Sequence, residues 1–531
     1  MRRRITFVQR PDSPFDLDQA VLSRDALSVS QVLAAREERV MLGVDEVEEE
    51  KIRHVLEQSH QLHIRWASEE VFDAVTPFSS RVAPGLHVLW TPREGEGETH
   101  SLCALLKEVF DDGLKCSSPE TSFVTPPVLS TRFAATAAYQ YHALLPSLGN
   151  LVSYIQKNLC AGSGSSSECH RQAASLASAD SLDINYDSIS HALTLTGYWS
   201  RSPDGGWTEQ IRKPAAGAGQ LEVGLLGTDK AVEPEEIKMG GLLGVVGSDD
   251  KLKPTLFSFP SRHHSLPNEA TYSVSFPAPT GLHPTMTISI PRSGLEPPPA
   301  PADATCALHT YLTLPSTIFG DKYQLATTDP LFLNSHHLKA LRAVAGETDL
   351  EAPDWFVPRW GSNWLLELAT PEQADQDPSQ DQQGDWNVTI PLHLRYQRPS
   401  ETGYRPASVP WPVVFWACTT EEGTKMGTNP FDRVNLGWEG LFGPRTMFYQ
   451  LAPRPRGSHQ ENHRQRLVED LDVPVLQLKE DGFFQGRTIE LGTVVVITLG
   501  LLWVLWKLGL VVRSSSGQRG ATRTDQQKKA Q

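Results

Sequence analysis

Four pairs of adjacent side chains are the first candidates for chemistry in this 531-residue chain. Two are histidine pairs, suited in principle to a transition metal, and two are aspartate pairs, suited to a divalent cation with a nucleotide sugar. Neighbouring strand residues point to opposite faces, and both aspartate pairs lie in polar turn sequences, so we predict no metal site. The pairs are His263-His264, His336-His337, Asp111-Asp112 and Asp249-Asp250.

Motifs with a known catalytic mechanism are missing from the sequence. It contains no Gly-x-Ser-x-Gly, no Gly-x4-Gly-Lys-Ser/Thr, no His-Glu-x-x-His and no Cys-x-x-Cys. The serine nucleophile, the phosphate-binding loop, the zinc site and the redox dithiol that these motifs build are therefore not predicted. We expect no catalytic residue, no cofactor and no metal, and hence a protein that is not an enzyme. A transferase or hydrolase with an unrecognised site is the rival hypothesis.

Residues 491–512 (LGTVVVITLGLLWVLWKLGLVV) predict one transmembrane helix within 489–512. Twenty-two residues at about 1.5 Å each span roughly 33 Å, enough for an endoplasmic-reticulum bilayer. Trp503 and Trp506 suit the aromatic belt, and Lys507 can reach the headgroups. One helix cannot line the cavity that a lipid-linked sugar transfer requires, but it can pack against the helices of another protein.

Charge predicts the orientation of this helix. Six positive charges and one negative charge lie from Lys507 to the C-terminus, in a chain of formal charge −15, so residues 513–531 are expected in the cytosol and the rest in the lumen. The glycosylation sequon at Asn387, six cysteines and Lys528-Lys529 near the end agree with an endoplasmic-reticulum membrane protein. The N-terminus has no apolar signal-peptide core, so a tail-anchored cytosolic adaptor stays open.

The hydrophobic pattern predicts a mainly β protein, with antiparallel β-sandwich lumenal domains, a mixed α/β N-terminal region and one C-terminal transmembrane helix. Alternating runs predict strands at residues 4–8, 62–66 and 85–90, and helical spacing predicts helices at 45–60 and 101–115. The expected organisation is an N-terminal α/β domain (1–160), a flexible linker (161–180), a β-rich domain (181–291), a β-sandwich domain (304–452), a polar tether (453–488), the transmembrane helix (489–512) and a basic cytosolic tail (513–531).

The sandwich segment carries a specific series of motifs. They are CALHTYLTLPSTIFGDKYQL at 306–325, IPLHLRYQRP at 390–399, GYR at 403–405, PWPVVFWAC at 410–418 and NPFDRVNLGWEGLFGPRTMFY at 429–449. In this order they resemble the PIG-X family, in its longer fungal protease-B-nonderepressible branch. The N-terminal portion resembles the same branch more loosely.

The resemblance implies a non-catalytic membrane subunit of the endoplasmic reticulum, with no cleaved signal peptide. Such a subunit stabilises a polytopic, PIG-M-like mannosyltransferase that adds the first mannose to the glycosylphosphatidylinositol (GPI) anchor precursor. No nucleic acid and no small-molecule substrate of its own is expected. A broader lumenal chaperone-like factor for several endoplasmic-reticulum proteins is the alternative.

Within these motifs, a small set of side chains is assigned to partner contact or to structure, the two roles remaining open. These residues are His309, Tyr311, His393, Arg395 and Tyr396. Cys306 and Cys418 bracket the segment and are a candidate disulfide, although connectivity cannot be read from sequence.

Overall fold

The computed structural model describes most of the chain in two compact units. The first comprises Met1–Tyr396 and Ala407–Leu471, and the second Gln397–Pro406 and Asp472–Gln531. The described residues are 1–9, 16–93, 100–127, 138–160, 166–214, 219–229, 231–266, 270–350, 352–371, 384–421, 436–455, 465–478 and 486–527.

A ten-stranded sheet forms the N-terminal part of the first unit, in the order β13-β12-β11-β1-β4-β9-β8-β5-β6-β7. All its neighbours are antiparallel except β1 and β11. The strands are β1 (Arg2–Gln9), β4 (Ala35–Gly43), β5 (Ser59–Ala67), β6 (Gly85–Pro92), β7 (Tyr139–Ala143), β8 (Ser181–Asp187), β9 (Ala192–Trp199), β11 (Gln220–Asp229), β12 (Glu236–Val245) and β13 (Lys253–Pro260).

The two faces of this sheet are buried against different partners. On β1, Ile5 and Phe7 pack with Leu27 and Val29 of a three-stranded sheet, whereas Val8 belongs to another cluster. This follows from the two-residue period of a strand. The small sheet contains β10 (Trp207–Arg212), β3 (Ala26–Val32) and β2 (Ala20–Leu22).

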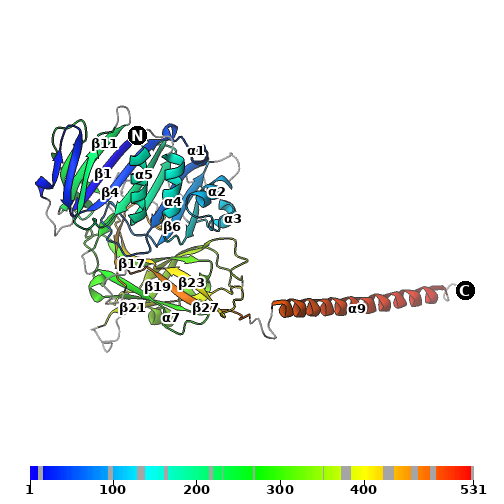
Figure 1. Cartoon of the computed structure of the whole chain (residues 1–531). Coiled ribbons are helices and arrows are strands. Elements are labelled where there is room, and N and C mark those ends of the chain that lie inside the picture. Colours follow the sequence, from blue (N-terminus) through cyan, green and yellow to red (C-terminus); the bar gives the residue numbers. More distant parts are fainter. Residues whose placement is uncertain are drawn as a thin grey trace. The chain divides into compact units, whose positions relative to one another are not determined.

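Short helices cover the part of the sheet near β5 and β6 (Figure 1). They are α1 (Glu50–Glu57), α2 (His100–Val109), α3 (Pro119–Ser122), α4 (Gly149–Tyr154) and α5 (Ser166–Ser175). Leu56 of α1 and Leu106 of α2 lie in one core cluster with Trp66 and Val88 of the sheet. Helical spacing thus supplies the apolar stripe that these helices bury.

Two further sheets make up the C-terminal part of the first unit. The six-stranded sheet has the order β14-β25-β24-β17-β20-β19, and the four-stranded sheet has the order β21-β16-β15-β26. The strands are β14 (His263–Ser265), β15 (Thr271–Ser275), β16 (Thr285–Ile290), β17 (Thr305–Pro315), β19 (Leu338–Gly346), β20 (Gly361–Leu368), β21 (Trp386–Pro391), β24 (Val413–Thr419), β25 (Thr446–Gln450) and β26 (Ala452–Pro453).

The remaining elements are short, apart from the last helix. They are β18 (Ile318–Phe319) paired with β22 (His393–Leu394), β23 (Tyr404–Pro410) paired with β27 (Val468–Pro474), α6 (Lys322–Leu325), α7 (Pro330–His336), the 3₁₀ helices η1 (Leu17–Gln19), η2 (Val44–Glu46), η4 (Leu176–Ser178), η5 (Arg292–Leu295) and η6 (Glu439–Leu441), the π-helix η3 (Ile155–Leu159), and α9 (Gly486–Gln527).

The strand-rich architecture agrees with the predicted fold class, but its sheets cross the predicted segment boundaries. Strands from 1–160 and from 181–291 alternate in one ten-stranded sheet, because β4 pairs with β9 and β5 with β8. Ten strands of the two segments therefore share one sheet. Likewise the sheets of the 304–452 segment take β14, β15 and β16 from residues before 304.

Two segments that composition marks as linkers also contain regular structure. Within 161–180, α5 forms and Cys169 is bonded to Cys160. Within 453–488, β27 pairs with β23, and Arg466 forms an ion pair with Glu69. Polar composition predicted a flexible linker and a polar tether, but the described residues of these segments include a helix, a disulfide and a paired strand. The apolar helix, in contrast, is found as expected, with Gly486–Arg513 long and apolar enough to cross a membrane.

Candidate interaction surface

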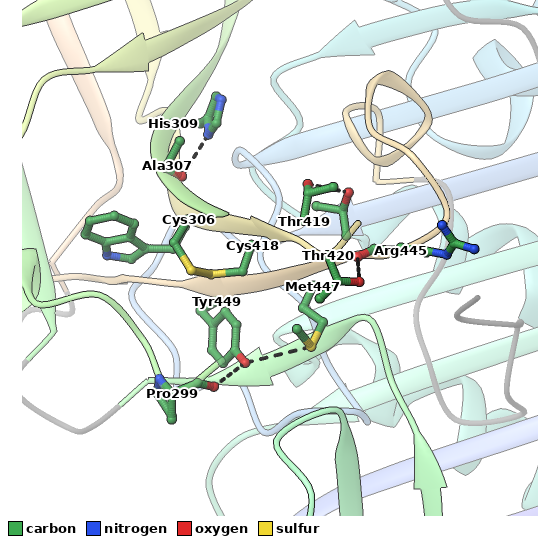
Figure 2. Close-up of a disulfide and its surroundings, with 12 residues drawn as sticks. Pro299, Cys306, Ala307, His309, Cys418, Thr419, Thr420, Arg445, Met447 and Tyr449 are labelled. Atoms are coloured by element: carbon green, nitrogen blue, oxygen red, sulfur yellow. Dashed lines mark hydrogen bonds between the residues drawn. A yellow bond between two sulfur atoms is a disulfide. The ribbon is translucent and has the colours of Figure 1, made fainter. Parts of the chain in front are cut away.

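The predicted cysteine pair joins the two central strands of the six-stranded sheet. Cys306 of β17 and Cys418 of β24 are directly opposite in the antiparallel register, with Cα atoms 4.0 Å apart and an S–S distance of 2.05 Å. Figure 2 shows Tyr449 beside this bridge, its hydroxyl donating to the carbonyl of Pro299 at 2.6 Å. The bridge closes a sequence separation of 112 residues, and this loop contains five of the ten strands of the two C-terminal sheets.

His309 is buried within the same sheet and does not reach the surface. Its ring stacks on Phe415, with centroids 5.8 Å apart, and meets the edge of Phe442 at 5.1 Å. Its Nδ1 is 3.0 Å from the carbonyl oxygen of Ala307 (Figure 2). Burial lowers the pKa of His309 to about 4, so the ring is neutral at pH 7. These contacts favour the structural role.

Tyr311 is also buried and joins the two large sheets of the first unit. Gln140 of β7 donates from Nε2 to the Tyr311 hydroxyl at 3.3 Å. Burial raises the pKa of Tyr311. Gly437 closes over this pair with φ +101°, and a Cβ there would lie 2.9 Å from the Gln140 Nε2. A residue with a Cβ at position 437 would therefore clash with the Gln140–Tyr311 contact, and the positive φ also favours glycine there.

His393 and Arg395 share one aromatic partner, Phe319. The His393 ring stacks on Phe319 at 5.4 Å, and the Arg395 guanidinium carbon lies 4.1 Å from its centroid. His393 also approaches His283, with 3.0 Å between their Nδ1 atoms. Burial, followed by the neighbouring His283, lowers the pKa of His393. The two side chains therefore meet at one aromatic ring, as part of the packing.

Arg395 is 2% exposed and organises a loop that precedes β20. Its Nη1 donates to the backbone carbonyls of Asp349 and Ala352. Burial lowers the pKa of Arg395. Both acceptors lie on the same loop, so the Nη1 contacts tie residues 349 and 352 to Arg395, while its Nε and Nη2 are buried without a hydrogen-bond partner among the described residues.

Tyr396 is the exception among the candidate residues, because its side chain is 66% exposed. Its carbonyl accepts from the backbone N–H of Asp354 at 3.0 Å. This bond places Tyr396 beside a turn at residues 353–356, which we call the aromatic turn and which ends in exposed Trp355 and Phe356. The sequence reading missed this turn. Its signal was the adjacent pair Trp355-Phe356 directly after Pro353-Asp354.

Asn387, the predicted glycosylation residue, lies on β21, the outermost strand of the four-stranded sheet. Its side chain is exposed and accepts from the Ser289 hydroxyl at 2.6 Å, and its carbonyl is 2.7 Å from His337 Nδ1. An edge-strand asparagine is accessible to a transferase, so glycosylation of Asn387 stays a prediction.

The adjacent histidine pairs make separate contacts. His263 Nε2 is 2.6 Å from Glu439 Oε1, whereas His264 Nε2 is 2.8 Å from the Ser261 carbonyl. His336 contacts the Phe332 carbonyl, and His337 stacks on Trp386.

The aspartate pairs lie in turns, where Asp111 accepts from the Gly113 N–H and Asp249 from the Val245 N–H. Within the described residues, no group of three or more His, Cys, Asp or Glu side chains is arranged to hold a metal ion.

Another buried histidine pair was not predicted. The rings of His87 on β6 and His142 on β7 lie 4.7 Å apart, and their Nε2 atoms contact the carbonyls of Ala83 and Pro84. Burial lowers both pKa values, that of His142 to about 4. His87 and His142 are directly opposite in the antiparallel pairing of β6 and β7, and no local sequence motif predicts this.

The apolar helix α9 presents its side chains to its surroundings along the whole candidate span, none of which is buried. Near one end, the Lys507 ammonium lies 5.4 Å from the Trp506 ring and 5.9 Å from the Trp503 ring. This arrangement suits the boundary between hydrocarbon and headgroups. The helix therefore offers both an anchor and a surface for another membrane helix.

Comparison with known proteins covers the whole chain. Residues 279–509 match the sequence family described as PIG-X / PBN1, a range that includes strands of both C-terminal sheets and most of the apolar span. "Protein pbn1" of Aspergillus oryzae is 66% identical over 561 aligned positions, covering 100% of both chains. "Protein pbn1" of Neurospora crassa is 39% identical over 98% of this chain and 97% of its own.

Among solved structures, a type II cohesin dyad from the ScaA scaffoldin of Acetivibrio cellulolyticus aligns with 85% of this chain and 96% of its own. The identity is 8% and the TM-score 0.16, so this likeness carries no argument.

Proposed function

This chain belongs to the PIG-X / PBN1 family, in its fungal Pbn1 branch, and on that premise we propose that it stabilises the mannosyltransferase of GPI-anchor assembly. Family membership makes it an accessory protein of GPI-anchor biosynthesis. The finer proposal is a non-catalytic subunit of the endoplasmic-reticulum membrane, bound to the polytopic enzyme that adds the first mannose to the precursor. The observation that carries it is the full-length similarity to Pbn1 proteins.

The arrangement of the chain supports an accessory role. His263 and His264 are engaged in internal contacts, and the apolar helix found among the described residues is exposed along its span. A single helix cannot enclose a polar lipid-linked donor, whereas it can pack on a partner that does. Binding to the folded enzyme alone would raise the enzyme's stability by mass action.

Three disulfides support a lumenal location for the folded part. Cys103–Cys116, Cys160–Cys169 and Cys306–Cys418 use all six cysteines of the chain. Disulfides form and persist in the oxidising lumen and are rare in the cytosol. We therefore propose that the residues before α9 are lumenal, with the basic tail in the cytosol and Asn387 available for glycosylation.

The test is depletion of this protein in its own cells, followed by analysis of GPI precursors and of the mannosyltransferase. We expect the unmannosylated glucosaminyl-inositol lipid to accumulate and the enzyme level to fall. A matched control restores the full chain with residues 491–512 intact or replaced by an unrelated apolar helix of equal length. This separates anchoring from specific helix contacts.

Three outcomes would overturn the proposal. A normal precursor profile with unchanged enzyme levels excludes a role at the first mannose. A normal profile with misfolding of many other lumenal proteins moves the conclusion to a general chaperone-like factor. Conversely, transfer of mannose by the purified chain alone would make it an enzyme.

A further inference from the structure

The aromatic turn at residues 353–356 carries large apolar side chains outward from a folded surface. Phe356 is 74% exposed and Trp355 52%, beside Tyr396 at 66%. The turn is closed by the N–H of Phe356 donating to the carbonyl of Pro353 at 3.0 Å, and the N–H of Asp354 joins it to Tyr396. Three aromatic rings thus emerge from two backbone segments that are hydrogen-bonded to one another.

Polar groups beneath the turn hold it in place. Arg395, 2% exposed, donates to the Asp349 and Ala352 carbonyls on the chain that enters the turn. The Asp354 carboxylate accepts from the Ser316 hydroxyl at 2.6 Å. These contacts hold the backbone of the turn, so binding through the aromatic side chains needs little further ordering of the backbone.

The charge of the turn has an exposed lysine as its counterion. Asp354, its one ionisable residue, is mostly buried and lies 3.7 Å from the Lys115 ammonium in addition to its bond with Ser316. The two residues at the tip, Trp355 and Phe356, are both uncharged. An apolar phase can therefore receive the tip without stripping water from an isolated charge.

The occupant is indicated by the rest of the chain. Helix α9 carries a span suited to a bilayer, and only 14 residues lie between Leu471 and Gly486. At a maximum of about 3.6 Å per residue, this segment keeps Leu471, the last residue of the first unit, within roughly 50 Å of Gly486. The first unit is thus tethered by its C-terminal end close to a bilayer, and tryptophan, tyrosine and phenylalanine are the side chains that partition into the bilayer interface.

We propose that the aromatic turn docks into the interfacial zone of the bilayer, as a second, reversible membrane contact beside the helix. Trp355 and Phe356 enter the boundary between headgroups and acyl chains, and Tyr396 lies alongside with its hydroxyl toward water. The ligand is a zwitterionic lipid surface, because the contact is apolar and the chain carries a net charge of −15. This inference does not depend on the proposed function.

The experiment uses the full chain reconstituted in phosphatidylcholine vesicles. All six native cysteines are in disulfides, so Phe356→Cys introduces one labelling site for an environment-sensitive fluorophore. Lipids with a nitroxide at a shallow or a deep acyl position then report its depth. The matched control is Val232→Cys, 85% exposed and remote in sequence. We expect the probe at 356 to shift to the blue and lose emission to the shallow nitroxide more than to the deep one, with neither change at 232.

A second variant tests whether the aromatic neighbours drive the contact. Trp355→Ser with Tyr396→Ser, added to the labelled protein, should remove the blue shift and the quenching. Circular dichroism should stay unchanged because these side chains are exposed. Equal quenching at 356 and 232, or none at 356, overturns the proposal. A probe at 356 that changes only when the mannosyltransferase is co-reconstituted also overturns it, and assigns the turn to a protein partner.

Discussion

Removal of the Cys306–Cys418 bridge offers a quantitative test of how the C-terminal sheets are stabilised. In the chain-entropy description, a cross-link restricts the unfolded chain in proportion to the logarithm of the loop that it closes. A separation of 112 residues corresponds to about 5 kcal/mol at 25 °C. The Cys160–Cys169 bridge, with a separation of 9, corresponds to about 2.5 kcal/mol. Cys306→Ala with Cys418→Ala should therefore cost roughly 2 kcal/mol more than Cys160→Ala with Cys169→Ala.

The two bridges are well matched for this comparison. Each joins a fully buried cysteine, Cys418 or Cys160, to a half-buried one, so the cavity left by alanine is similar in both. The measurement is hydrogen exchange of backbone amides in the purified full chain, followed across a guanidinium series. Amides of β17 and β24 report the opening of the C-terminal sheet, and amides of α5 report the short loop.

The expected result is specific in place as well as in size. The long-loop variant should lose protection throughout β17 and β24, whereas the short-loop variant should lose it mainly around α5. Equal losses of unfolding free energy in the two variants would refute the loop-length reasoning. Thiols titrating in the denatured wild-type chain would contradict the pairing itself.

Three further outcomes follow from the same contacts. Burial lowers the pKa of His142 and of His309 to about 4, so below pH 6.5 the unfolded chain binds more protons than the folded chain. The free energy of unfolding should therefore fall from pH 6.5 toward pH 4, by about 3 kcal/mol per histidine. His309→Phe should make this pH dependence shallower in unfolding curves. Arg395→Met should cost about 2–4 kcal/mol and release the aromatic turn to proteolysis, with Arg395→Lys intermediate, whereas a change confined to local cleavage without loss of stability would contradict the bracing role. Asn387→Gln should abolish one glycan-dependent gel shift but change the free energy of unfolding by no more than about 0.5 kcal/mol. A wild-type band with no glycan-dependent shift would contradict the lumenal assignment.

Much of the local structure could be predicted from the chain alone. Residues 4–8 alternate because one face of β1 packs on the small sheet, and the strand Arg2–Gln9 contains them. The helical spacing after residue 44 corresponds to η2 and α1, although its last residues belong to β5, because pairing with β6 and β8 outweighs one more helical turn. Local sequence patterns such as helical hydrophobic spacing thus predict where an element lies, but not always the residue at which it ends.

The sequence by itself determined the features that need no distant partner: the apolar span of α9, the alternating strands and the missing catalytic motifs. Tertiary structure alone decided which strands share a sheet, since β1 pairs with β11 across more than two hundred residues. It also decided that His309 and Arg395 are internal while Tyr396 is exposed. Burial depends on what the rest of the chain brings to each side of a strand, and a local pattern carries no record of that.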